Sequence, residues 1–209
     1  MVGVIPDAEA RELPNRYVHL MGPGVCDKPR DLSQALAWWL DGGEEETFFE
    51  RSMGPSGPMV PTSAAHRFAD FIEDANVSTA ATDAMQDAST TLMPEAVGAG
   101  LFVATARKAN PVAALYYGLG AQRSAMLPGW FGNFLLSADE VRAALPHVEE
   151  ALLMSDEQRG TALSPITDWM TAMGDTPDGD AAELIDAPLR VVRYAAENGS
   201  GAAAFSRWY

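Results

Sequence analysis

Hydrophobic positions at helical spacing recur along most of the chain, and cap residues mark the start of several of these segments. The clearest start is the capping box formed by Ser137 and Glu140, and Pro146 is expected to kink or divide the helix that follows. Asn110 before Pro111 is typical of a cap followed by the first helical residue. The pattern predicts helices over residues 31–40, 62–75, 78–88, 110–117, 137–152, 165–173 and 186–198.

Strand signals are fewer and shorter. Alternating or compact apolar runs predict strands over residues 16–21, 134–136 and 202–209, and the apolar residues 95–106 favour a helix over a strand. Residues 44–60 include two prolines and two glycines within five positions, so we expect a loop there. Together these elements predict an α+β fold, a predominantly helical single domain over residues 1–209 with a small sheet of short strands.

Composition excludes several classes of partner. The chain has 209 residues, is 47% hydrophobic and 21% charged, and is therefore expected to fold. Its 14 basic against 29 acidic residues give a net charge of −15, which argues against nucleic acids and anionic membranes. No apolar run approaches the ~18–20 residues of a membrane span, and the acidic N-terminal stretch is unlike a signal peptide. We expect a soluble, cytoplasmic protein, and its single cysteine, Cys26, cannot form an intramolecular disulfide.

Four segments in this order are similar to features of a known family. They are the aromatic helix and glycines of residues 31–43, the Asn-Pro helix of 110–120, the strand and capped helix of 134–141, and the closing helix, glycine and strand of 189–205. In these the chain resembles the YfbM-like family of small bacterial proteins, a domain of unknown function. The resemblance implies the fold and leaves the function open. Residues 44–95 are longer than the family's corresponding connection, which suggests a loop-rich insertion.

Candidate catalytic groups are sparse. His66 and Asp70 are spaced to share one face of the predicted helix with Glu73, which suits general base chemistry or part of a metal site. A solvated polar face explains the same spacing, and no metal site is predicted. His19 and Cys26 form a conceivable nucleophile pair, although a lone cysteine is more typical of a small buried hydrophobe. The glycine-rich segments match no nucleotide-binding fingerprint, so no cofactor is expected.

The segment 116–134 combines aromatic and polar residues around glycines and a proline. Such a segment is typical of a ligand pocket or a partner-binding surface, and equally of aromatics that fill the core beneath a loop. The guanidinium of Arg123 in this segment suits a carboxylate ligand or an internal ion pair. The candidate ligand-binding residues are Tyr116, Tyr117, Gln122, Arg123, Trp130, Phe131 and Asn133.

Two function hypotheses follow. The first is an acidic cytoplasmic binding protein, of inhibitor, immunity or ligand-binding type, for a protein partner or a small molecule. The second is a small-molecule enzyme with an apolar pocket lined by Trp130, Phe131 and Tyr117, containing a carboxylate or histidine with a perturbed pKa. The sequence leaves the oligomeric state open.

Overall fold

A computed structural model describes residues 1–17, 32–76, 79–175 and 181–206 of the chain. Its helices are α1 (Asp7–Tyr17), α2 (Ser33–Leu40), the 3₁₀ turn η2 (Gly43–Glu45), α3 (Ser63–Ala75), α4 (Ala80–Leu92), α5 (Pro111–Ser124), α6 (Ala138–Leu152), α7 (Asp156–Ala172) and α8 (Ala181–Asn198). Its strands are β1 (Val2–Ile5), β2 (Phe49–Arg51), β3 (Met59–Pro61), β4 (Leu101–Phe102), β5 (Phe134–Leu136) and β6 (Gly201–Ala204). The predicted helical α+β domain with short strands is confirmed.

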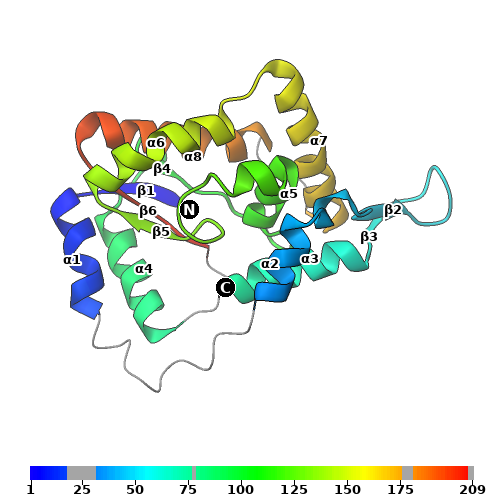
Figure 1. Cartoon of the computed structure of the whole chain (residues 1–209), viewed down its shortest axis with the longest axis horizontal. Coiled ribbons are helices and arrows are strands. Elements are labelled where there is room, and N and C mark those ends of the chain that lie inside the picture. Colours follow the sequence, from blue (N-terminus) through cyan, green and yellow to red (C-terminus); the bar gives the residue numbers. More distant parts are fainter. Residues whose placement is uncertain (18–31, 77–78, 176–180, 207–209) are drawn as a thin grey trace.

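The larger sheet of the described residues joins the two ends of the chain. Its four strands run in the order β4-β1-β6-β5, and every neighbouring pair is antiparallel. In β1, Val2 lies opposite Phe102 on one side and Ala204 on the other. The first and last strands are therefore central and adjacent, which brings the segments before α1 and after α8 together (Figure 1).

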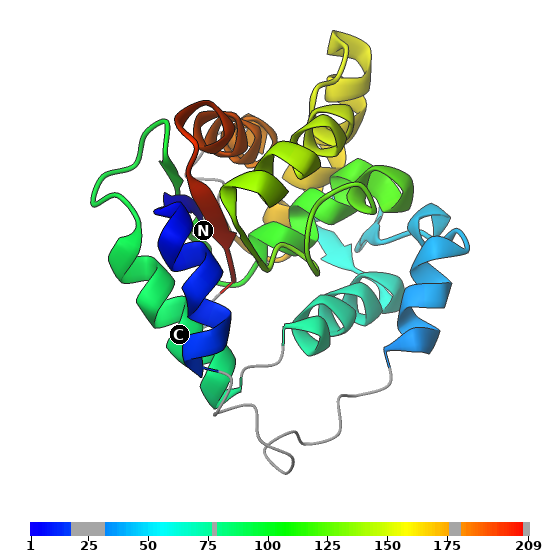
Figure 2. The same cartoon turned by 60° about the vertical axis from the view of Figure 1, so that its left-hand side comes forward.

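Different helices cover the two faces of this sheet. Alternate residues of a strand point to opposite faces, so Val2 packs with Val191 of α8, whereas Ile5 packs with Leu13 of α1. Helices α6 and α8 lie on one face, and α1 and α4 lie side by side on the other (Figure 2). The alanines of β6 are buried between these layers, where small side chains allow close approach.

The remaining helices, α2, α3, α5 and α7, enclose an aromatic cluster beside the sheet. The ring of Phe48 stacks on that of Tyr117 with centroids 4.4 Å apart, and Trp39 lies 4.3 Å from Phe68. Trp169 of α7 contacts Phe48, Phe68 and Tyr117. This cluster forms part of the largest hydrophobic core of the described chain, so Phe48 and Phe68, within the predicted insertion of residues 44–95, supply core side chains.

Two predictions about irregular segments are wrong. Residues 44–60 are not simply a loop, because β2 and β3 pair as an antiparallel hairpin that projects from the domain (Figure 1). Pro61 is tolerated because both strands are edge strands. Residues 95–106 contain β4 and irregular backbone in place of the favoured helix. Gly100 allows the backbone before β4 to lie close to β1, since a Cβ there would lie 3.0 Å from the side chain of Val4.

Several element boundaries also differ from prediction. The predicted strand 16–21 is wrong at Arg16 and Tyr17, which end α1, and the rest of it lies outside the described residues. Helix α7 begins nine residues before the predicted start, and α8 begins five residues before its predicted start. Helix α5 continues past Tyr117, and α6 runs through Pro146 without being divided.

The predicted helix starts at Thr62, Asn110 and Ser137 are confirmed. Thr62 caps α3 through the N–H of Ala64, and the Ser137 capping box opens α6 as expected. Thr79 caps α4 in a box with Thr82, one residue after the predicted cap, and α4 extends to Leu92. The predicted cap Asp31 lies outside the described residues, as do His19 and Cys26.

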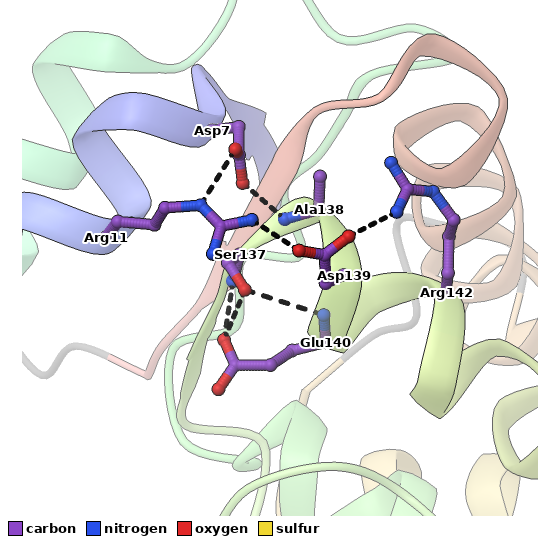
Figure 3. A network of polar contacts seen from close by, with 7 residues as sticks. All are labelled: Asp7, Arg11, Ser137, Ala138, Asp139, Glu140 and Arg142. Atoms are coloured by element: carbon purple, nitrogen blue, oxygen red, sulfur yellow. Dashed lines mark hydrogen bonds and ion pairs between the residues drawn. The ribbon is translucent and has the colours of Figure 1, made fainter.

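A network of polar contacts ties α1 to the start of α6 (Figure 3). Asp7 accepts a hydrogen bond from the N–H of Ala138 at 2.6 Å, and Arg11 bridges Asp7 and Asp139 at 2.9 and 2.7 Å. The Ala138 N–H and the Arg11 side chain hold the pKa of Asp7 below its usual value. A helix from one face of the sheet thereby caps a helix from the other face.

Candidate functional site

A partly enclosed cavity of about 300 Å³ lies between the larger sheet, the start of α5, and helices α6 and α8. Its wall is mainly apolar, and among the described residues that line it there is no Asp, Glu, His, Lys or Arg. Sheet residues close one side, the loop before α5 closes another, and helical side chains supply the rest. Representative wall residues are Val2, Phe102, Ala106, Leu115, Val148, Leu152, Leu184, Val192 and Ala204.

Asn110 connects this cavity to the start of α5. The residue lines the cavity and is only 4% exposed. Its Oδ1 accepts hydrogen bonds from the N–H groups of Val112 at 2.9 Å and Ala113 at 3.3 Å, the geometry expected of an N-cap. The opposite amide atom, Nδ2, is buried and has no hydrogen-bond partner among the described residues.

Asp175 holds the cavity loop from a distant part of the chain. Its Oδ2 accepts from the backbone N–H of Ala109 at 2.6 Å and Lys108 at 2.8 Å, and its two oxygens share the N–H of Arg107. Burial raises the pKa of Asp175, but the three N–H donors and the Lys108 charge outweigh it, so the pKa lies below its ordinary value. The carboxylate is therefore ionised at neutral pH.

Tyr116 is the predicted ligand-binding residue that lines the cavity. Its hydroxyl oxygen accepts from the N–H of Gly132 at 3.1 Å, and among the described residues no acceptor takes its own proton. Burial raises the pKa of Tyr116 to about 12, against a smaller opposing effect of the Gly132 N–H. At neutral pH the phenol thus remains a hydrogen-bond donor.

The expectation that Trp130, Phe131 and Tyr117 line the cavity is wrong. Tyr117 faces the aromatic cluster because successive helical residues point about 100° apart, so Tyr116 and Tyr117 serve different regions. Phe131 is buried against Tyr116 and Phe71, with ring centroids 5.2 and 4.7 Å away. Trp130 is 41% exposed at the turn before β5.

The polar candidates of this segment have structural contacts of their own. Arg123 donates to the carbonyls of Glu150 and Ala151 at 2.9 and 3.0 Å, near the end of α6. Among the described residues it forms no ion pair, and its Nη1 instead donates to carbonyls at the α6 terminus, which lack partners within the helix. Gln122 is exposed.

Asn133 fastens the turn that precedes β5. Its Nδ2 donates to the carbonyls of Trp130 and Phe131, and its Oδ1 accepts from the N–H of Ser206 at 3.3 Å. The side chain thus links this turn to the residues after β6. It does not line the cavity.

His66 and Asp70 lie on the exposed face of α3, away from the cavity. No hydrogen bond or ion pair between these two described side chains is present in the structure. Partial desolvation raises the pKa of the neighbouring Glu73, and the charges of Asp70 and Asp74 raise it further. Within the described ranges, no three His, Cys, Asp or Glu residues are grouped as metal ligands.

A break in α5 separates the cavity-lining half of the helix from Arg123. Gly120 has φ +73° and ψ 170°, a conformation that side chains rarely adopt. The carboxylate of Glu44 accepts a hydrogen bond from Ala121, the first residue after the break, and so caps the second half from a distance. No local sequence signal marks this interaction, because Glu44 and Ala121 are far apart in the chain.

A further polar group at the cavity is the amino group of Met1. It donates to the carbonyl of Phe205 at 3.1 Å, and burial lowers its pKa to about 6. Above pH 7 this amine is therefore mainly uncharged.

Comparisons of this chain with protein-family models, with curated proteins and with solved structures find no match. Among the described helices, none combines the length and apolarity that crossing a membrane requires.

Proposed function

We propose that this protein binds a small apolar molecule in the cavity between the larger sheet, α5, α6 and α8. The observation that carries the proposal is the cavity itself, about 300 Å³ of mainly apolar surface. Ligand sites are typically concave and apolar with a few placed polar groups. Asn110 and Tyr116 supply such groups here.

The cavity volume sets the size of the ligand. A buried cavity of about 150 Å³ holds benzene, so about 300 Å³ accommodates roughly a dozen non-hydrogen atoms. At about −0.5 kcal/mol per atom, between the limits for very small and drug-sized ligands, binding amounts to about −6 kcal/mol. This corresponds to a Kd of tens of micromolar.

The proposal is the ligand-binding form of the acidic binding protein considered from sequence. In the inhibitor form, the acidic surface engages a basic protein, and binding weakens as salt is added. In the ligand-binding form, affinity depends on apolar burial and changes little with salt. Salt dependence therefore separates the two.

A titration of the ¹⁵N-labelled protein with butylbenzene tests the proposal. We expect saturable shifts in the amide signals of α5, α6 and α8. Val192→Phe and Ala106→Phe each fill the cavity and are expected to weaken binding at least tenfold, while both variants stay folded. Val97→Phe is the matched control, because Val97 is exposed and does not line the cavity.

The absence of saturable shifts in the wild-type protein would overturn the proposal. Equal affinity of the wild type and both filled variants would also overturn it. Ala106 is only partly buried and lies in a loop, so Ala106→Phe keeps the test valid if Val192→Phe fails to fold.

A further inference from the structure

Two buried hydrogen-bond donors beside the cavity, one in Asn110 and one in Tyr116, have no acceptor among the described residues. Among the described residues, Asn110 Nδ2 has no partner, and the Tyr116 O–H has no acceptor. Both side chains line the cavity, and each is only 4% exposed. A buried donor without a partner costs about 1–3 kcal/mol, so an acceptor brought in by a ligand would recover part of that cost.

The cap geometry fixes which atom of Asn110 is free. Because Oδ1 accepts from Val112 and Ala113, the amide must present Nδ2, a donor, on its other side. The N-terminal end of α5 adds a partial positive potential at the same place. Both effects favour an oxygen that carries partial negative charge.

Asp175 makes a full negative charge on the ligand unfavourable. Its carboxylate already occupies the N–H groups of Arg107, Lys108 and Ala109, immediately before Asn110. The pKa of Asp175 lies below its ordinary value, so this negative charge persists at neutral pH. A second carboxylate beside Asn110 would face like-charge repulsion in a poorly solvated region.

We infer that the apolar ligand carries a neutral carbonyl oxygen, as in a ketone, ester or lactone, which accepts a hydrogen bond from Asn110 Nδ2. This inference rests on the proposed function and specifies its ligand class. Because Nδ2 has almost no accessible surface, side chains of the cavity wall beside it must move for the oxygen to reach it. The apolar remainder of the ligand lies against α6, α8 and the sheet.

Three compounds of similar size test the ligand class, with binding measured at pH 8. Butyrophenone has a neutral carbonyl, butylbenzene has no acceptor, and 4-phenylbutanoate has a carboxylate. We expect butyrophenone to bind about fivefold more tightly than butylbenzene, the effect of one hydrogen bond, and 4-phenylbutanoate to bind most weakly. If the cavity wall offered no donor at Asn110, butylbenzene would bind more tightly than butyrophenone, because the carbonyl would lose its hydrogen bonds to water and gain none in the cavity.

The side-chain amide signals of Asn110 give a direct readout. They are expected to shift with butyrophenone and to stay in place with butylbenzene. Asn110→Ser and Asn110→Thr keep a neutral side-chain oxygen for the N-cap but remove the amide donor. Both variants are expected to lose the fivefold preference, while Tyr116→Phe and the outlying control Tyr117→Phe keep it.

Any other pattern of binding would overturn the inference, and each pattern points to a different cause. Equal binding of butyrophenone and butylbenzene, or a preference that survives in both Asn110 variants, excludes the amide as the donor. A preference lost only in Tyr116→Phe assigns the donor to the phenol. In all these cases butylbenzene still binds, whereas failure of the proposed function abolishes binding of every compound.

Discussion

Asp175 provides the sharpest test of how the cavity loop is held in place. Three consecutive backbone N–H groups, those of residues 107–109, donate to one carboxylate that is 66 to 68 positions away in sequence. Asp175→Ala removes the acceptor and leaves these donors without it, and Ala109 is itself buried. The perturbation acts on the loop that precedes Asn110, with no direct change to the cavity wall.

The magnitude follows from the contacts. Hydrogen bonds to a charged group contribute about 1.5–3 kcal/mol each, and the three here share one carboxylate, so their contributions are not additive. We expect Asp175→Ala to lower the free energy of unfolding by about 3 kcal/mol. For a domain of this size, that loss lowers Tm by about 6–12 °C.

The direction of the pKa shift of Asp175 determines how its contribution to stability changes with pH. The pKa of Asp175 is lower in the folded than in the unfolded chain, so its contribution is present above the unfolded pKa. The contribution is lost as the pH falls below about 5 and through the depressed folded value. The stability difference between wild type and Asp175→Ala should therefore be largest near pH 7 and should shrink toward pH 3.

Urea unfolding at pH 7, 5, 4 and 3 measures this difference. Asp156→Ala is the control for loss of an exposed carboxylate. A difference that stays constant from pH 7 to pH 3, or one below 1 kcal/mol at pH 7, would refute the reasoning.

Substitutions at three further positions test other parts of the fold by urea unfolding. Phe48→Ala removes the ring stacked on Tyr117 and should cost about 3–5 kcal/mol; a cost below 1 kcal/mol would mean that the aromatic cluster does not support the core. Ser155→Ala removes the cap of α7 and should cost about 1 kcal/mol, whereas Ser155→Thr should be near neutral, and equal losses would contradict the cap. Gly120→Ala places a Cβ 2.8 Å from the Glu44 carboxylate at φ +73° and should cost about 1–3 kcal/mol; unchanged stability would count against the break in α5.

Local signals account for what could be predicted about the helices. The Ser137 box and the Asn110 cap act over three residues, so sequence alone identified them correctly. The box of Ser155 and Gln158 that opens α7 was equally visible and was missed, which placed the start of that helix too late. Where a helix runs through a proline, as α8 does at Pro188, the tertiary packing of its buried face maintains the helix and no local signal predicts its extent.

The sheet was harder to predict because its strands depend on distant partners. Residues 202–204 of β6 are alanines, a poor strand former, and they pair with β1 from the opposite end of the chain. Residues 101 and 102 form β4 through pairing with Val2 and Gly3. The predicted strands 134–136 and 202–209 match or overlap β5 and β6, whereas no local pattern predicted β1 and β4, because short strands of this kind are stabilised by the sheet as a whole.

The candidate site shows the same division between local and distant causes. Of the candidate residues in the aromatic segment 116–134, Tyr116 lines the cavity while Tyr117 faces the aromatic cluster. One step along a helix changes direction by about 100°, and a hydrophobic pattern does not show which of two buried faces borders a void. The cavity also needs α8 and the sheet, whose positions no short motif determines.

Asn110 shows why a residue with a confirmed structural role still leaves a question of function. As an N-cap, asparagine is nearly equivalent to aspartate and serine, because all three present an oxygen to the first turn. The three side chains differ on the side that faces away from the first turn, where only asparagine presents an amide donor. At an exposed cap that donor faces water and the difference is small, whereas here it is buried beside an apolar cavity without a partner. The exchange of Asn110 for serine should therefore be mild for the fold and decisive for the choice of ligand.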